Sequence, residues 1–273
     1  MTQFPRWAEL PLREVEHAGN DHRMFRLGEH LVARLPSDAE YVPQVAKEQE
    51  WLPRLAPQLP LPIPVIRARG KASPDFDAPW SIYGWRPGAT LAAAPVSDAE
   101  GLAEDLAAFL VALRVADASA GPTPGAHSAY RGGPVDRWDD DIQVLRHRVS
   151  GRERGLVEGI WRDALAASFD GPAVWVHGDV AAGNLLVQHG RLSAVLDFGC
   201  SAVGDPACDT VPVWTFLRGT ARVVFRRALD VDDATWARGR GWALWKGLIM
   251  LTNTAAGQAE FGRRVLDELF AGV

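Results

Sequence analysis

The alternation of apolar and polar residues in the first third of the chain predicts β-structure around a single helix. Residues 23–35 read as two strands joined by a turn at residues 28–30, and residues 80–86 read as a buried strand. Between them, a helical stretch begins near Pro43, a favourable first-turn residue, and Pro53 is expected to kink or end it. We therefore expect a small β-rich unit in the N-terminal part.

The remainder of the chain has mainly the helical period. Ser97 and Glu100 form a predicted capping box, followed by an apolar stripe of Leu102, Leu106, Leu110 and Leu113. Residues 117–135 are rich in glycine and proline and predict a long loop, which in a compact domain is usually functional or mobile. Residues 173–199 read as a strand, a loop and a hairpin, and the tail from about Asp233 reads as helical.

Pro87 and Gly88 punctuate the chain directly after the strand at residues 80–86. We place a boundary there, which gives an N-terminal lobe of residues 1–86 and a C-terminal lobe of residues 87–273. Strands with one helix, followed by a mostly helical part, predict a two-lobed α+β protein with a cleft between the lobes.

Composition narrows the class of protein. The 273 residues are 47% hydrophobic and 23% charged, which is ordinary for a globular protein. No apolar run approaches the ~18 residues of a membrane span, and the N-terminus does not resemble a signal peptide, so we expect no membrane partner. Two cysteines, Cys200 and Cys208, indicate a reducing cytoplasm. A net charge of -5 argues against a nucleic-acid partner, and the oligomeric state stays open.

One segment of the C-terminal part carries recognisable chemistry. Residues 174–209 contain His177-Gly178-Asp179, then Asn184, then Asp197-Phe198-Gly199. Phosphoryl transfer needs a carboxylate that orients the attacking hydroxyl and an Asn and an Asp that hold metal on the phosphates. Asp179, Asn184 and Asp197 are the residue types required for these roles.

A hairpin would bring these side chains together. If His189-Gly190 is a two-residue turn and Gln188 pairs with Arg191, Asn184 lies opposite Val195. Asp197 is then the diagonal neighbour of Asn184, roughly 7–8 Å away at the backbone. Two oxygen-bearing side chains at that spacing can share Mg²⁺, with substrate phosphates filling its remaining positions.

Two other interpretations of the segment remain open at this point. It can be a buried hairpin whose polar residues are solvated caps. Alternatively, His177, Asp179 and Asp197 can be ligands in a metal hydrolase, although no second histidine lies at ligand spacing.

The motifs in residues 177–199 continue into Gly204-Asp205-Pro206 and Asp209. Together they resemble the aminoglycoside phosphotransferase family, and the resemblance covers nearly the whole chain. It implies a protein-kinase-like fold and a kinase for small molecules such as antibiotics, choline-like compounds or sugars. The Gly-Asp-Pro run, and the lack of an Ala-Pro-Glu segment after residue 199, argue against an ordinary protein kinase.

The resemblance also implies roles for individual residues. Asp179 would be the catalytic carboxylate, and Asn184 and Asp197 would be the Mg²⁺ ligands. His177 and Asp209 would support the catalytic loop. ATP or GTP is the implied co-substrate.

Kinase-like folds use a strand lysine, oriented by a helix glutamate, to hold the α- and β-phosphates. None of the lysines here lies on a predicted strand, and Arg34 stands at the matching place. Arginine can do this job because it stays charged and grips phosphate and carboxylate through a planar fork. Glu48 shares the apolar face of its helix, so we expect it to point inward and pair with Arg34.

Other nucleotide contacts are implied by the resemblance alone. Residues 82–86 would form a hinge, with the Gly84 carbonyl and the Arg86 amide bonding the adenine and Tyr83 lining the pocket. Ordinary strand core is the alternative for these residues. No glycine-rich phosphate motif occurs at residues 17–22, where Gly19 is the residue expected to approach the phosphates.

The phosphate acceptor stays open. Residues 98–141 hold nine acidic residues against three arginines, which could attract a cationic aminoglycoside, but Asp139-Asp140-Asp141 is better explained as a helix N-terminus. From residue 200 onward, eight acidic and nine basic residues nearly balance, which does not favour a polycation. The tryptophans of the tail either line an apolar pocket, as for a macrolide, or belong to the core: Trp236, Trp242 and Trp245.

The sequence thus predicts a Mg²⁺-dependent O-phosphotransferase that moves the γ-phosphate of ATP or GTP to a small-molecule hydroxyl. A metabolic kinase for an amino alcohol, sugar or amino acid is as compatible as a resistance enzyme. The missing strand lysine and the weak glycine loop also leave a nucleotide-binding pseudokinase scaffold as an alternative.

Overall fold

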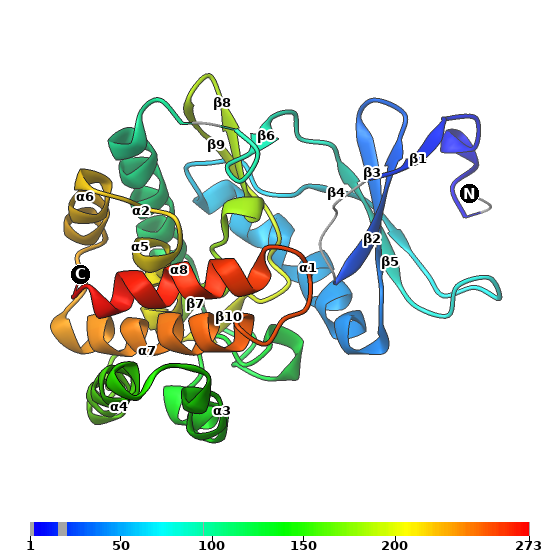
Figure 1. Ribbon diagram of the computed structural model, residues 1–273. Helices are drawn as coiled ribbons and strands as arrows, with labels where there is room; N and C mark the ends of the chain where they lie inside the picture. The colour runs from blue at the N-terminus through cyan, green and yellow to red at the C-terminus, as the bar shows by residue number, and fades with distance from the viewer. Residues whose placement is uncertain (1–2, 16–20, 95, 273) are drawn as a thin grey trace.

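The computed structural model describes residues 3–15, 21–94 and 96–272. A five-stranded sheet forms one end of the molecule, a mainly helical unit forms the other, and helix α1 (Val42–Leu55) lies between them (Figure 1). This is the two-lobed α+β architecture that the sequence predicts. The boundary between residues 86 and 87 stays a prediction.

The N-terminal sheet is antiparallel throughout, in the order β1-β2-β3-β5-β4. Its strands are β1 (Leu12–Glu14), β2 (His22–Leu27), β3 (Leu31–Pro36), β4 (Ile66–Gly70) and β5 (Trp80–Gly84). The turn predicted at residues 28–30 joins β2 to β3, and Gly28 adopts a φ of 61°, which suits glycine.

Alternation along β3 decides which side chains face α1. Val32 and Arg34 point to one face of the sheet, and Ala33 points to the other. Val32 joins the main hydrophobic core with Leu52 of α1, whereas Ala33 joins a smaller cluster on the opposite face of the sheet. The same alternation that buries Val32 therefore brings Arg34 toward α1.

Helix α1 continues past Pro53 to Leu55, so the expectation that it would end there was wrong. Proline has no N–H to donate to the carbonyl four residues earlier, which is that of Gln49. In the structure the Arg69 guanidinium donates to that carbonyl at 2.6 Å. Because the freed oxygen has a charged donor, the helix continues to Leu55.

The C-terminal part contains seven α-helices among the described residues, together with five short strands. The helices are α2 (Ala99–Val115), α3 (Asp139–Leu145), α4 (Gly151–Ala166), α5 (Pro212–Thr215), α6 (Thr220–Leu229), α7 (Asp233–Met250) and α8 (Gln258–Phe270). The strands are β6 (Ala89–Thr90), β7 (Val174–Val176), β8 (Leu185–Gln188), β9 (Arg191–Val195) and β10 (Ala202–Gly204), where β7 pairs with β10 and β8 pairs with β6 and β9.

Helix α2 starts differently from the prediction. Its N-cap is Asp98, whose side chain accepts from the Gly101 N–H at 2.8 Å, so the capping box of Ser97 and Glu100 was wrong. Aspartate and serine are both good caps, and local sequence does not separate adjacent candidates. The predicted leucine stripe is fully buried.

The hairpin β8–β9 turns at His189-Gly190 and pairs Gln188 with Arg191, as predicted. A bulge between Leu186 and Val187 shifts the register by one residue, so that Leu185 lies opposite Val195 in place of Asn184. The Asn184 carbonyl instead accepts from the Leu196 N–H at 2.7 Å. Asn184 and Asp197 therefore leave the same end of the hairpin.

The acidic run and the tryptophans of the tail belong to structure. Asp139, Asp140 and Asp141 form the first turn of α3, the helix N-terminus favoured from sequence. Trp236, Trp242 and Trp245 are all buried in the core. Within residues 3–15, 21–94 and 96–272, no helix is long and apolar enough to cross a bilayer.

Candidate active site

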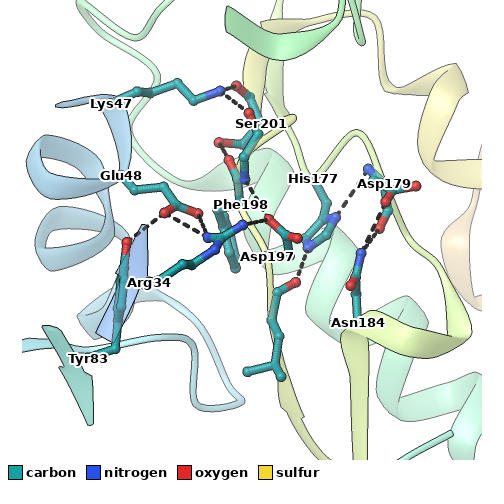
Figure 2. A network of polar contacts seen from close by, with 12 residues as sticks. Arg34, Lys47, Glu48, Tyr83, His177, Asp179, Asn184, Asp197, Phe198 and Ser201 are labelled. Carbon is teal, nitrogen blue, oxygen red and sulfur yellow. Dashed lines mark hydrogen bonds and ion pairs between the residues drawn. The ribbon is translucent and has the colours of Figure 1, made fainter. Parts of the chain in front are cut away.

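Arg34 ties the sheet to the helical part of the molecule (Figure 2). Its Nη1 donates to both carboxylate oxygens of Glu48, at 2.8 and 2.9 Å. Its Nη2 donates to Asp197 Oδ1 at 2.6 Å. The Tyr83 hydroxyl donates to Glu48 Oε2 at 2.6 Å, so Glu48 is held from two strands.

This cluster is buried and charged. Arg34 is 9% exposed and Glu48 is 2% exposed, so each needs the other to offset the loss of water. Burial lowers the pKa of Arg34, but Asp197 and Glu48 outweigh it and hold that pKa above its usual range. Burial likewise raises the pKa of Asp197, but Arg34 outweighs it and keeps that pKa below its ordinary value.

Asp179 lies on the loop before the hairpin and has partners from two directions. The Asn184 amide donates to the Asp179 carbonyl at 3.0 Å and to Asp179 Oδ2 at 3.1 Å. Lys246 of α7 forms an ion pair with Asp179 Oδ1 at 3.1 Å. Burial raises the pKa of Asp179, but Lys246, Arg131 and His177 outweigh it and hold that pKa below its usual value.

His177 and Asp209 fix the backbone of this loop. The two oxygens of Asp209 accept from the His177 and Gly178 N–H groups, each at 2.8 Å. His177 Nδ1 accepts from the Asp179 N–H at 3.3 Å, and Nε2 lies 2.9 Å from the Leu196 carbonyl. Gly178 has a φ of 81° and packs against the loop at Cys200, where a side chain would collide with backbone.

These contacts bear on the metal-hydrolase alternative. Both ring nitrogens of His177 are engaged with backbone groups, so neither is free to bind a metal. The described ranges also contain no group of three or more His, Cys, Asp or Glu side chains placed to hold a metal ion. The structure thus weakens that interpretation.

Unlike His177, the two residues predicted to bind Mg²⁺ each keep a side-chain oxygen that is not hydrogen-bonded to the described residues. The side-chain nitrogen of Asn184 donates to Asp179, and the side-chain oxygen has no partner among the described residues. Asp197 Oδ1 accepts from Arg34 and from the Gly199 N–H, and Oδ2 has no partner in the same ranges. Two free oxygens from an amide and a carboxylate suit Mg²⁺, which takes its other ligands from phosphates and water.

Lys47 has a structural position that the sequence did not indicate. Its ammonium donates to the carbonyls of Gly199 and Ser201, at 2.6 and 2.8 Å (Figure 2). It also donates to the His127 carbonyl at 3.0 Å. Burial lowers its pKa to about 8. Lys47 therefore fastens α1 to the loop that carries Asp197.

Two further titratable groups lie next to the cluster at the start of β2. Burial, together with the nearby charge of Asp197, raises the pKa of Asp21 to about 6. Burial and the Arg34 charge lower the pKa of His22 to about 3, and both of its ring nitrogens are buried without a hydrogen-bond partner among residues 3–15, 21–94 and 96–272.

The residues predicted to contact the adenine bond to other parts of the protein. Tyr83 is 4% exposed and bonds to Glu48, so its hydroxyl serves the charged cluster. The Gly84 N–H donates to the Val65 carbonyl, and an added Cβ on Gly84 would lie 3.2 Å from Arg67 Nε. The Arg86 side chain reaches the Ile63 carbonyl at 3.4 Å. Gly19 lies outside the described residues.

Lys246 and Arg131 are the charged residues beside Asp179 that sequence analysis missed. Lys246 stands four residues after Trp242 on α7 and so shares its helix face, which was the available signal. Arg131 lies in the glycine- and proline-rich loop, where no periodicity indicates direction.

Comparison with known families decides what this arrangement belongs to. The family model described as "Phosphotransferase enzyme family" (APH) matches residues 13–242, which include every residue of the cluster. The chain belongs to this phosphotransferase family. The prediction that the protein is a phosphotransferase is therefore confirmed. No curated protein matches the sequence.

Solved structures share the fold of this phosphotransferase. The GDP and kanamycin complex of APH(2")-IIia has a TM-score of 0.76 at 20% identity, covering 99% of this chain and 96% of its own. The apoenzyme of macrolide 2'-phosphotransferase MphH from Brachybacterium faecium has a TM-score of 0.68 at 23% identity, covering 97% of each chain. The streptomycin-ATP-APH(2")-IIa ternary complex has a TM-score of 0.63 at 18% identity, covering 99% and 94%. These similarities confirm the kinase-like fold.

Proposed function

We propose that the protein is a Mg²⁺-dependent O-phosphotransferase that moves the γ-phosphate of ATP or GTP to a hydroxyl of a small molecule. The observation that carries the proposal is the joining of two charged groups of residues at one place. Arg34 and Glu48 meet Asp197 on one side, and Asn184 meets Asp179 on the other (Figure 2). A phosphoryl group held between them would face a carboxylate placed to orient a hydroxyl.

Asp179 is proposed as the catalytic residue. Its pKa lies below the ordinary value, so it is ionised at neutral pH and can accept a hydrogen bond from the acceptor hydroxyl. Such a weak base contributes mainly by orienting the hydroxyl, which suits a loose phosphoryl-transfer transition state. His177 and Asp209 are proposed as positioning residues because they bond to the backbone on either side of Gly178.

Asn184 and Asp197 are proposed to hold Mg²⁺ through the side-chain oxygens that the protein leaves unbonded. When bound, the ion would neutralise charge on the nucleotide phosphates. Arg34 already has Glu48 and Asp197 as partners, and its fixed, fully charged guanidinium is proposed to steady the α- and β-phosphates. In the same proposal Gly19 approaches the phosphates, and the Gly84 carbonyl and Arg86 amide bind the adenine.

The acceptor is proposed to be a small molecule, because the similar structures include complexes with kanamycin and streptomycin. Antibiotics of the aminoglycoside and macrolide classes therefore belong in an acceptor panel beside metabolic amino alcohols, sugars and amino acids. Cytoplasmic location fits this proposal, since ATP and GTP are its co-substrates.

The variant Asp179→Asn tests the catalytic assignment. It keeps the shape of the side chain and removes the carboxylate, so we expect turnover to fall by about 10²-fold or more while nucleotide affinity changes little. The matched control is Asp163→Asn, on an exposed turn of α4, which should retain full activity. Turnover of Asp179→Asn within tenfold of the wild type would contradict the assignment.

A further inference from the structure

A small pit opens beside Asp179, on the side that faces α7. Its walls include Arg131, Val211, Trp242 and Lys246. The cavity volume is about 10 Å³, close to what a single water needs. The pit can therefore receive one oxygen or a similarly small polar group, and it is too small for a sugar ring.

The side chains that line this pit carry two positive charges, on Arg131 and Lys246, and one negative charge, on Asp179. Asp179 is already paired with Lys246. Asp209, the other nearby carboxylate, accepts from two backbone N–H groups and is buried. Arg131 has no ion pair and no hydrogen bond within the described ranges, and its Nε is buried without an acceptor. Arg131 is thus a cation without a direct ion pair among the described residues, and it lies close enough to Asp179 to lower the pKa of that carboxyl.

Arg131 is held in place by aromatic rings. Its guanidinium carbon lies 4.5 Å from the Trp245 ring centroid and 5.2 Å from that of Trp242. Asp141 accepts from the Trp245 indole N–H at 2.8 Å, and within the described ranges it forms no ion pair with Arg131. Ring contacts fix the direction of a guanidinium, but they do not neutralise its charge.

The backbone before Arg131 is also constrained. Ala129 and Tyr130 adopt φ angles of 46° and 57°, a left-handed conformation that costs energy for residues other than glycine. Directly after this turn, Arg131 packs its Cβ against Gly178 of the loop that carries Asp179. The guanidinium is therefore positioned relative to Asp179 by both backbone and ring contacts.

We propose that Arg131 binds an anionic group of the phosphate acceptor, so that the substrate is a hydroxyl compound with a carboxylate or phosphate close to the reacting hydroxyl. The inference rests on the proposed function and deepens it. A partly buried guanidinium without a direct ion pair binds an oxygen of a carboxylate or phosphate through strong, charge-assisted hydrogen bonds. A polycationic acceptor would instead meet two cations offset by one carboxylate, and such like-charge contacts are costly.

Matched acceptor pairs test this proposal. The wild-type enzyme is assayed with Mg²⁺ and ATP or GTP on a panel of hydroxy acids with their amides and of sugar phosphates with their parent sugars, with kanamycin as the polycation. We expect the anionic member of at least one pair to have a kcat/KM at least about tenfold higher than its neutral partner, because a charged hydrogen-bond pair is made only with the anion. Whether the preferred pair is a hydroxy acid or a sugar phosphate distinguishes the two anions.

Substitutions then assign the preference to Arg131. In Arg131→Met the advantage of the anionic member should disappear, mainly through a higher KM, and Arg131→Lys should retain part of it. The control is Arg137→Met, because Arg137 also stacks on an aromatic ring, at 3.3 Å from the Tyr130 centroid, but is exposed and outside the pit wall. If Arg131→Met does not fold, the partial loss in Arg131→Lys carries the test.

Three results would overturn the inference: kanamycin or the neutral members are the best substrates, no anionic member is phosphorylated, or the preference survives undiminished in Arg131→Met and Arg131→Lys. Nucleotide binding is measured on the same samples by thermal shift. Binding of Mg²⁺-nucleotide without phosphorylation of any anionic member contradicts this inference alone. Absence of nucleotide binding in the wild type contradicts the proposed function.

Discussion

Replacing Arg34 by methionine tests the charged cluster that joins the two lobes. Methionine has a similar length and no charge, so among the described residues the variant leaves the buried Glu48 with the Tyr83 hydroxyl as its one remaining partner. Asp197 also loses its cation, but it is more exposed and can be hydrated. Most of the cost therefore arises at Glu48.

The size of the effect follows from the burial of the pair. Removing one partner of a buried ion pair typically costs about 3–5 kcal/mol, because the other charge stays behind in a dry site. In urea unfolding at pH 7 this corresponds to a midpoint lower by about 1–2 M, given slopes of about 2–3 kcal/mol/M. The double variant Arg34→Met/Glu48→Gln should recover at least about 1 kcal/mol, because it removes the stranded charge.

Nucleotide binding separates the two roles of Arg34. The matched control is Arg238→Met, since Arg238 pairs with Asp205 at 2.6 Å and both are buried, but neither belongs to the proposed nucleotide site. Both single variants should lose stability, and only Arg34→Met should also lose affinity for Mg²⁺-nucleotide. A loss below about 1 kcal/mol in Arg34→Met, or a double variant no more stable than the single one, would refute the reasoning.

Three further substitutions follow from the surroundings of the cluster. The first substitution is His22→Phe. In the folded protein the pKa of His22 is about 3, so on acidification protons bind first to the unfolded chain, and stability falls as the pH drops through 6.5. Between pH 7 and 4.5, urea titrations should therefore show that the wild type loses about 2–3 kcal/mol more unfolding free energy than His22→Phe. Lys47→Met should lower the free energy of unfolding by about 2–3 kcal/mol, because it leaves three carbonyls without their donor. The exposed control Lys71→Met should change it by no more than about 0.5 kcal/mol, and equal losses in the two variants would contradict the structural role of Lys47. Lys246→Met removes the strongest charge that lowers the pKa of Asp179, so the acid limb of the kcat/KM profile should move to higher pH, and an unmoved limb would argue against Asp179 as the group that titrates.

Much of the fold could be predicted because its signals are local. The turn at His189-Gly190 and the pairing of Gln188 with Arg191 depend on adjacent residues. The bulge between Leu186 and Val187 shifted the register by one, and it could not be predicted because no residue type is specific for it. Pro53 shows the same limit, since the guanidinium that bonds the freed carbonyl comes from β4, 16 residues further along the chain.

In the candidate site, too, some contacts could be predicted from local sequence and others could not. The pairing of Arg34 with Glu48 was predictable because a carboxylate on the apolar face of a helix needs a partner. The contact of Lys246 with Asp179 joins residues 67 positions apart and has no local pattern. Arg131 follows two left-handed residues within a loop, where neither period nor hydrophobicity indicates direction.

The central claim is that Asp197, together with Asn184, holds Mg²⁺-nucleotide. The most direct measurement is a thermal-shift titration of the wild type and of Asp197→Ala with ATP and with GTP, with and without Mg²⁺. A ligand that binds only the folded state adds about 2.7 kcal/mol at 100 times its Kd, which is an easily visible shift. The account predicts that at least one nucleotide stabilises the wild type only when Mg²⁺ is present, and that Asp197→Ala shows no such shift. If neither nucleotide stabilises the wild type, or if Asp197→Ala is stabilised equally, the claim is wrong.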